Sequence, residues 1–442
     1  MRVNTPVTVA QKYTHEGAPA ARINAEQALK RSVMACMLWE DTFYEEGTEI
    51  QERIGSLIKQ VPAETVAAIA LGARTAMKLR HVPLLLAVEM AKLPTHRHVV
   101  ASTVASIIQR PDELAEILAI YSKGRTGTKT LNKLSKQLQT GIAVAFRKFN
   151  EYSLAKYNQD NAIKLRDVLF LTHPKPESLE QHQLWMRLVN GTLATPDTWE
   201  VALSAATDKK AAWTRLLTEE KLGAFALLRN LRNMKEAGVD ENLIKNALLN
   251  MSTERVLPFR FIAAARYAPQ WEQYLEAAML RSLVDFPKLL GKTAIVVDNS
   301  GSMDSKVSGK SEITRQDAAS ALAILVREVC QDTVVIGFGD SAAVIPARRG
   351  FALRDAIQRG PGGGTNTQTA LMLAQQQGYD RIIVITDEQS HQAIGAPARG
   401  AKGYFINVAT NKNGIGYGPW THIDGWSEAV LQYIVAAEAD GR

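Results

Sequence analysis

The stretch TAIVVDNSGSMDS, residues 293–305, places an apolar run directly before a loop of short polar side chains. Three further runs, TVVIGFG (333–339), RIIVITD (381–387) and GYFINVA (403–409), are also rich in valine and isoleucine, with little polar alternation. Such runs are typical of strands that are buried on both faces of a parallel sheet. Helix-like stretches lie between them. The alternation predicts an α/β domain whose open, doubly wound (Rossmann-like) sheet carries helices on both sides.

Oxygen-bearing side chains follow the predicted strands. Asp298 and Asp387 each end an apolar run, and Ser300 and Ser302 follow Asp298 on alternate residues. A glycine-rich loop, GPGGGTNT, supplies Thr365. Ligands of open α/β sheets bind outside the carboxyl ends of the strands. Because hydroxyl and carboxylate oxygens suit a hard cation, we expect these side chains to hold Mg²⁺ or another divalent cation.

The loop matches none of the common catalytic motifs. The G-x-S-x-G elbow is absent, and neither His391 nor His422 has a spacing that argues for a catalytic triad. Gly309-Lys310-Ser311 ends like a P-loop, but the earlier glycine of that motif would fall at position 304, which is aspartate. Two-metal nuclease sites need several carboxylates, whereas this loop is rich in hydroxyls. We therefore expect a protein that is not an enzyme.

The chain from about residue 20 to residue 285 has a helical pattern. Segments such as VPLLLAVEMAKL (82–93) place apolar residues at helical spacing, and prolines fall near the segment starts. Short amphipathic helices with short breaks favour stacked hairpins of the HEAT or armadillo kind; a globular helical bundle is the alternative. The pattern changes within LVDFPKLLGK (283–292). We therefore expect a helical domain over 1–285 and an α/β domain over 286–442.

The net charge of +7 belongs entirely to the helical part, since residues 286–442 hold 15 basic and 15 acidic side chains. Between Tyr121 and Arg166, ten basic residues stand against only Glu151 and Asp160. Such a local excess is typical of a surface that binds a polyanion, and a solvated helix face is the alternative. The candidate RNA contacts in this segment are Lys129, Lys133, Lys136, Arg147 and Lys148.

Composition argues against other classes. No run of about 18 apolar residues occurs, so no membrane span is expected. The first residues lack the apolar core of a secretory signal. The two cysteines, Cys36 and Cys330, are far apart and show no metal-binding spacing. This usage fits a reducing compartment, so we expect a cytoplasmic protein.

The oxygen-bearing pattern resembles the metal-ion-dependent adhesion site (MIDAS) of von Willebrand factor A domains. The motif D-x-S-x-S, a later threonine and a later aspartate match at Asp298, Ser300, Ser302, Thr365 and Asp387. The resemblance implies that the serines touch the metal, that Thr365 binds directly or through water, and that the aspartates often act through water. An acidic side chain of a partner would complete the coordination. Helix capping by Ser and Asp is the plainer alternative, but it would explain one loop and not three.

Strings in the helical part resemble the TROVE domain of the Ro60/Rsr family of Y RNA-binding ring proteins. GAFALLRNLRNMKEAGV (223–239) is similar to the family's L-L-R-N-L motif, and VLPFRFIAAARYA (256–268) to its P-F segment. A TROVE-like part followed by an A-domain-like part is the family's domain order. The resemblance implies a monomeric ring of HEAT-like repeats that the von Willebrand factor A domain closes.

The resemblance also implies the partners. Family members bind small non-coding Y RNAs on a basic outer surface and the 3′ ends of misfolded or damaged RNAs in the central hole; a ribonuclease or another protein is a further expected partner. Lys156 and His173 stand where the family has RNA-binding residues, whereas Asp160 stands where the family can carry an arginine. The alternative is a protein-interaction scaffold whose A domain docks an acidic partner through Mg²⁺, with RNA incidental.

Overall fold

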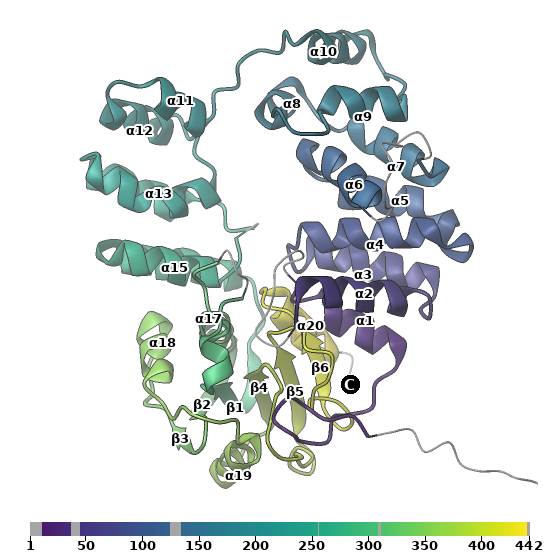
Figure 1. Ribbon diagram of the computed structural model, residues 1–442. Helices are drawn as coiled ribbons and strands as arrows, with labels where there is room; N and C mark the ends of the chain where they lie inside the picture. Colours follow the sequence, from purple (N-terminus) through teal and green to yellow (C-terminus); the bar gives the residue numbers. More distant parts are fainter. Residues whose placement is uncertain (1–10, 37–44, 124–133, 255, 308–310, 440–442) are drawn as a thin grey trace, which may run out of the picture.

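The computed structural model describes residues 11–36, 45–123, 134–254, 256–307 and 311–439. Two arms of stacked helices rise from a sheet domain, and the segment between α10 and α11 joins the arms at the top (Figure 1). Helical repeats in the N-terminal part and an α/β sheet in the C-terminal part confirm the predicted fold class. Among the described residues, no helix is long and apolar enough to cross a bilayer.

The sheet has six strands in the order β3-β2-β1-β4-β5-β6. All neighbouring strands are parallel except β2 and β3, which form an antiparallel pair at one edge. Parallel neighbouring strands must be joined by crossover connections, which are usually helices. This explains why strand-like and helix-like stretches alternate in the sequence. The strands are β1 Leu289–Asp298, β2 Cys330–Phe338, β3 Ala342–Val344, β4 Arg381–Thr386, β5 Lys402–Asn407 and β6 Thr421–Asp424.

Strand β1 is buried on both faces because helices cover both sides of the sheet. Ala294 and Val296 pack in a cluster that includes residues of helix α19 (Thr367–Gln377). Ile295 and Val297 point to the other side, into a larger cluster that includes helix α17 (Arg315–Val329) and continues into the helical arms. One hydrophobic core therefore joins the sheet to the helical part.

Sixteen α-helices precede the sheet in the described part of the chain. Prolines sit near several helix starts as expected: Pro62 is the N-cap of α3 and Pro111 is the first residue of α6. The helices are α1 Ala25–Val33, α2 Gly47–Ile58, α3 Ala63–Thr75, α4 His81–Lys92, α5 Arg97–Ile107, α6 Pro111–Lys123, α7 Lys136–Phe146, α8 Glu151–Tyr157, α9 Leu165–Thr172, α10 Leu179–Asn190, α11 Trp199–Ala205, α12 Lys209–Thr218, α13 Ala224–Glu236, α14 Glu241–Asn250, α15 Phe259–Tyr267 and α16 Glu272–Leu280.

Both ends of the helical part dock on the sheet domain, which closes the ring. At the later end, α15 packs on α17, and Arg266 donates to the buried Asp317 carboxylate at 2.7 Å. At the earlier end, Arg31 of α1 forms a fully buried ion pair with Glu388, with 2.5 Å between Nη1 and Oε2. The remaining domain helices are α18 Gly350–Gln358 and α20 Ala429–Ala439.

The segment before α1 lies against the sheet domain, although the boundaries expected from sequence assign it to the helical part. Thr14 donates its hydroxyl proton to the carbonyl of Ser390 (2.8 Å), and the Ala21 N–H donates to the carbonyl of Gly414 (2.9 Å). Ala18 is fully buried in the cluster on the α19 side of the sheet. The first described residues of the chain therefore pack on the C-terminal α/β domain.

The Arg31–Glu388 ion pair predicts a large stability effect. Removing one partner of a buried pair leaves an uncompensated charge, so Arg31→Met should lower the free energy of unfolding by about 3 kcal/mol. Lys30→Met is the matched control, because Lys30 pairs with Glu26 on the surface and such pairs contribute at most about 1 kcal/mol. Urea unfolding followed by tryptophan fluorescence measures both. Equal losses in the two variants would contradict the role given to Arg31.

Candidate functional site

Asp298 ends β1 in a fully buried position and is held by hydrogen bonds from two chain segments. Its Oδ1 accepts from the Ser300 N–H at 2.8 Å, and its Oδ2 accepts from the hydroxyl of Thr386 at 2.5 Å. Thr386 is the last residue of β4, the neighbouring parallel strand. The carboxylate is therefore fixed at the sheet edge before any ligand arrives.

The hydroxyl groups of the site come from loops that meet at this edge. The Ser300 and Ser302 Oγ atoms lie 3.3 Å apart, and both side chains are buried. Thr365 is buried just before α19. The Gly301 N–H donates to the carbonyl of Gly363 at 2.8 Å, which joins the first loop to the glycine-rich one. Gly363 has a φ of +98°, a conformation that side chains other than glycine rarely adopt.

A buried arginine that sequence reasoning missed contacts the fifth predicted ligand. Arg315, the first residue of α17, donates from Nη1 to Asp387 Oδ2 at 2.7 Å, and both side chains are buried. A cation in the first turn of a helix opposes the helix dipole. In the sequence, the position of Arg315 at the start of the helical stretch ITRQDAAS is the one feature that indicates a specific anionic partner.

The donor set fits a hard cation. Burial, and then the neighbouring Asp387 carboxylate, raises the pKa of Asp298 to about 7. The buried carboxylates of Asp298 and Asp387 repel each other, so a cation between them would be stabilising. Arg315 supplies only one positive charge. The described residues hold no group of three His, Cys, Asp or Glu that could bind a metal. A metal ion here would depend on hydroxyl oxygens, as Mg²⁺ accepts.

Glu388 follows Asp387 but faces the opposite way, toward the helical part. Its backbone has a φ of +62°, and its side chain contacts Arg31 and His422, with 2.6 Å between Oε1 and the His422 Nε2. His422 also lies 3.4 Å from Asp424. Burial would raise the pKa of Glu388, but the charges of His422 and Arg31 lower it to about 2. The loop that carries Asp387 is thus tied to the ring closure.

The predicted RNA contacts are spread over several helices. Lys129 and Lys133 lie outside the described residues. Lys156, near the end of α8, has its Nζ 5.7 Å from the ring centroid of Tyr157. His173 is exposed and ends α9 in the left-handed conformation. Of the described candidates, Lys136, Arg147 and Lys148 thus belong to α7 or its end, Lys156 to α8 and His173 to the end of α9.

Several cations of the basic segment have partners within the chain. Arg147 pairs with Glu177 at 3.3 Å. Lys148 donates to the carbonyls of Ala105 and Ile108 at the end of α5, the latter at 3.0 Å. Lys164 pairs with Asp160, the acid that stands at a usually basic position of the family. The charge that is free to meet a polyanion is consequently smaller than the sequence count indicates.

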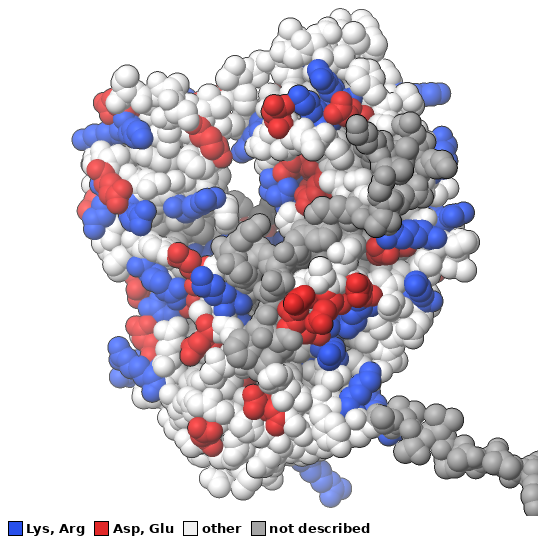
Figure 2. All heavy atoms as spheres, viewed as in Figure 1, with Lys and Arg blue, Asp and Glu red and all other residues white. Residues whose placement is uncertain are grey.

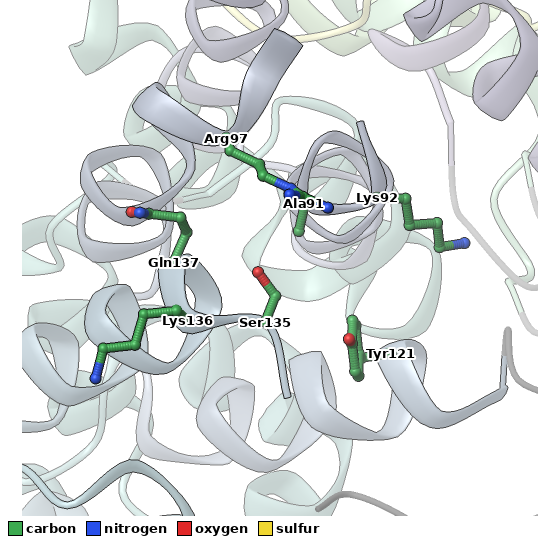
Figure 3. Close-up of a pocket in the computed structure, with 7 residues that line it drawn as sticks. All are labelled: Ala91, Lys92, Arg97, Tyr121, Ser135, Lys136 and Gln137. Carbon is green, nitrogen blue, oxygen red and sulfur yellow. The ribbon is translucent and has the colours of Figure 1, made fainter. Parts of the chain in front are cut away.

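Lys136 lines a basic pocket of about 560 Å³ between α4, α5, α6 and α7 (Figure 3). Among the described residues, no acidic side chain lines this pocket. In Figure 3 the Arg97 guanidinium and the Ser135 hydroxyl point toward the middle, whereas the Lys136 ammonium points away. The lining residues are Ala91, Lys92, Arg97, Tyr121, Ser135, Lys136 and Gln137.

Comparisons with known proteins agree with the expected domain order. The TROVE domain matches residues 191–285, and the von Willebrand factor type A domain matches residues 293–389. The crystal structure of the Deinococcus radiodurans RO (RSR) protein superposes with a TM-score of 0.57, covering 95% of this chain and 100% of that one at 18% identity. At this identity the likeness shows a shared fold. The resemblance stated from sequence is thereby confirmed, with both domains in order.

The metal site predicts a magnesium-dependent gain in stability. A ligand that binds only the folded chain stabilises it by about 2.7 kcal/mol at 100 times its Kd. Millimolar MgCl₂ should raise the thermal midpoint of the wild type and of Asp304→Ala, because Asp304 is an exposed residue of the same loop outside the motif. Asp298→Ala should show no rise. A rise of the same size in Asp298→Ala would place the ion elsewhere.

His422 predicts a pH dependence of stability. Burial would lower its pKa, but the charges of Asp424 and Glu388 raise it to about 9. Its positive charge therefore contributes fully below the unfolded pKa of about 6.5 and ceases to contribute as the pH rises through 9. The thermal midpoint of the wild type should fall over this range by more than that of His422→Gln. Parallel curves would refute the assignment.

Proposed function

We propose that this chain, which joins a TROVE domain to a von Willebrand factor type A domain, is a non-enzymatic RNA-binding ring protein. Its ligands would be small non-coding, Y-like RNAs and the 3′ ends of misfolded RNAs, and its role RNA quality control. The ring fold and the TROVE match support the coarser part of this proposal, RNA binding. The specific RNAs and the role rest on the resemblance.

The observation that carries the proposal is the distribution of charge. The whole net charge of +7 lies in residues 1–285. Within the described part of the chain, one pocket there is lined by Lys92, Arg97 and Lys136 and by no acidic side chain, although Lys92 pairs with Glu89. Phosphate contacts dominate the affinity of proteins for nucleic acids. A pocket of this composition suits the phosphate groups of a folded RNA better than it suits an apolar ligand.

The A domain would act as a docking module. With Mg²⁺ bound, Ser300 and Ser302 would hold the ion directly, while Asp298 and Asp387 would balance its charge. The ion would supply a Lewis-acidic position for the carboxylate of a partner, such as an acidic residue of a ribonuclease. The same hydroxyl-rich set disfavours a nuclease reaction, which needs clustered carboxylates. We also propose that the ring is a monomer in the cytoplasm, and the two free, buried cysteines fit such a reducing compartment.

A protein-interaction scaffold is the second candidate. It is favoured by the internal pairing of Arg147, Lys148 and Lys164, which reduces the free charge of the predicted RNA surface. In that function the helical arms would bind a protein and RNA would be incidental. The two candidates differ in the salt dependence of RNA binding.

Filter binding of a small structured RNA at two salt concentrations tests the proposal. Four phosphate contacts would weaken binding by about 150-fold between 50 and 200 mM salt. The double variant Arg97→Met/Lys136→Met should bind about 10-fold more weakly and show a shallower salt slope. Arg348→Met/Arg359→Met removes two exposed charges from the A domain and is the matched control. Micromolar or weaker binding without a salt slope would favour the scaffold.

A further inference from the structure

Residues 11–21, which we call the N-terminal strap, are bound to the loop that follows the predicted metal ligand Asp387. The Thr14 hydroxyl donates to the carbonyl of Ser390 at 2.8 Å, and a backbone N–H of the strap donates to the side-chain oxygen of Gln389 at 2.8 Å. Gln389 in turn donates from its amide nitrogen to the carbonyl of Asp387 at 3.1 Å. Figure 1 shows the strap in purple, running along the sheet domain before α1. The strap is therefore attached within a few residues of the predicted metal site.

Glu16 of the strap reaches the loop that carries Thr365. Its Oε2 lies 3.1 Å from the Nε2 atom of His391, and the same Nε2 accepts from the backbone N–H of Thr365 at 3.2 Å. His391 also packs closely on the glycine-rich loop, because a Cβ atom added at Gly364 would lie 2.7 Å from its ring. One imidazole therefore separates the Glu16 carboxylate from a predicted metal ligand.

The contacts of His391 do not fully satisfy the charge of Glu16. A single imidazole nitrogen cannot accept from the Thr365 N–H and donate to a carboxylate at the same time. Among the described residues, Glu16 forms no other ion pair, and its side chain is 36% exposed. A cation held by the neighbouring hydroxyl groups would balance this carboxylate without breaking the Thr365 hydrogen bond.

We propose that Glu16 is an acidic ligand that the chain itself supplies to the metal site of the A domain. With Mg²⁺ bound, the Glu16 carboxylate would take the position that the site offers to the carboxylate of a partner, so an acidic partner would have to displace it. The inference rests on the proposed docking function and gives that function its regulation. Glu16 is not among the metal ligands predicted from the sequence, because the whole helical part separates it from the sheet domain.

The attachment of the strap favours Glu16 over a carboxylate in solution. Thr14 anchors the strap on one side of Glu16, and the fully buried Ala18 anchors it on the other. A group held beside its site by a short tether has an effective concentration in the millimolar range. In Figure 2 the lowest part of the molecule, where the sheet domain lies, shows few charged side chains on this face that could guide a partner. A partner with several linked carboxylates would therefore compete best, because it also gains effective concentration.

The plainer alternative is a surface ion pair between Glu16 and His391 that has no role toward a metal. Removing Glu16 would then have the same effect whether or not Asp298 is present. A metal ligand, in contrast, acts only while the rest of the site is intact. The two alternatives therefore differ in whether the effect of Glu16 depends on Asp298.

The test compares Glu16→Gln with the matched control Glu26→Gln, because Glu26 is an exposed acid of α1 that pairs with Lys30. Binding of Mg²⁺ to the full chain is measured by isothermal titration calorimetry, and binding of fluorescein-labelled hexaglutamate in saturating MgCl₂ by anisotropy. We expect Glu16→Gln to bind Mg²⁺ about 10-fold more weakly, because a ligand is lost, and hexaglutamate about 10-fold more tightly, because a competitor is lost. Glu26→Gln should match the wild type in both assays. In the Asp298→Ala background, Glu16→Gln should have no further effect.

Two results would overturn the inference. The first is an equal Mg²⁺ affinity of Glu16→Gln and Glu26→Gln. The second is measurable hexaglutamate binding that is no tighter in Glu16→Gln than in the wild type. A thermal midpoint without Mg²⁺ that is lower in Glu16→Gln than in Glu26→Gln would identify a structural residue and would also count against the inference. The expected loss of Mg²⁺ affinity together with no hexaglutamate binding by any of the proteins would instead defeat the proposed docking function and leave Glu16 as a metal ligand.

Discussion

The buried ion pair between Arg31 and Glu388 ties the earlier end of the ring to the sheet domain, because it joins the first helix to the domain that ends the chain. Both side chains are fully buried, and the Arg31 guanidinium also donates to the backbone carbonyl of Asn413 at 2.9 Å. Glu388 adjoins Asp387, so the same loop serves the ring closure and the predicted metal site. A desolvated pair tolerates little displacement. The position of the loop at the metal site is therefore set partly by helix α1.

The sheet could be predicted from the sequence because its long strands are encoded as short, continuous runs of apolar residues. Val296 and Ile295 face opposite sides of β1 and both are buried, which is the arrangement that an apolar run without alternation indicates. That Asp298 and Asp387 lie at the ends of neighbouring strands at one edge was predictable for the same reason, since strand ends of a parallel sheet share one edge, whereas metal binding by the five residues stays a prediction. Arg31 was not predictable: its partner is 357 residues away, and in KRSV it resembles a surface cation.

The predicted RNA surface shows that a count of charged residues does not locate the charge that is available to a ligand. The sequence gives the excess of cations between Tyr121 and Arg166, but only the fold shows that Lys148 caps the end of α5 and that Lys164 faces Asp160. Conversely, Arg260 lies in the apolar string PFRFIAA, where it adds little to any charge count. Only the fold shows that Arg260 forms no ion pair among the described residues and lies against the rings of Phe225 and Phe259. Free charge, rather than total charge, decides where a polyanion binds.

The central claim is that the closed ring binds RNA through cations that the fold leaves unpaired. Photocrosslinking of a single-stranded RNA with a 3′-terminal 4-thiouridine, followed by mass spectrometry of the peptides, tests it most directly. The account predicts crosslinks in peptides of the helical part, such as those of α5 and α7 beside the basic pocket. Crosslinks confined to the sheet domain, or none above those formed with an unrelated basic protein, would contradict it.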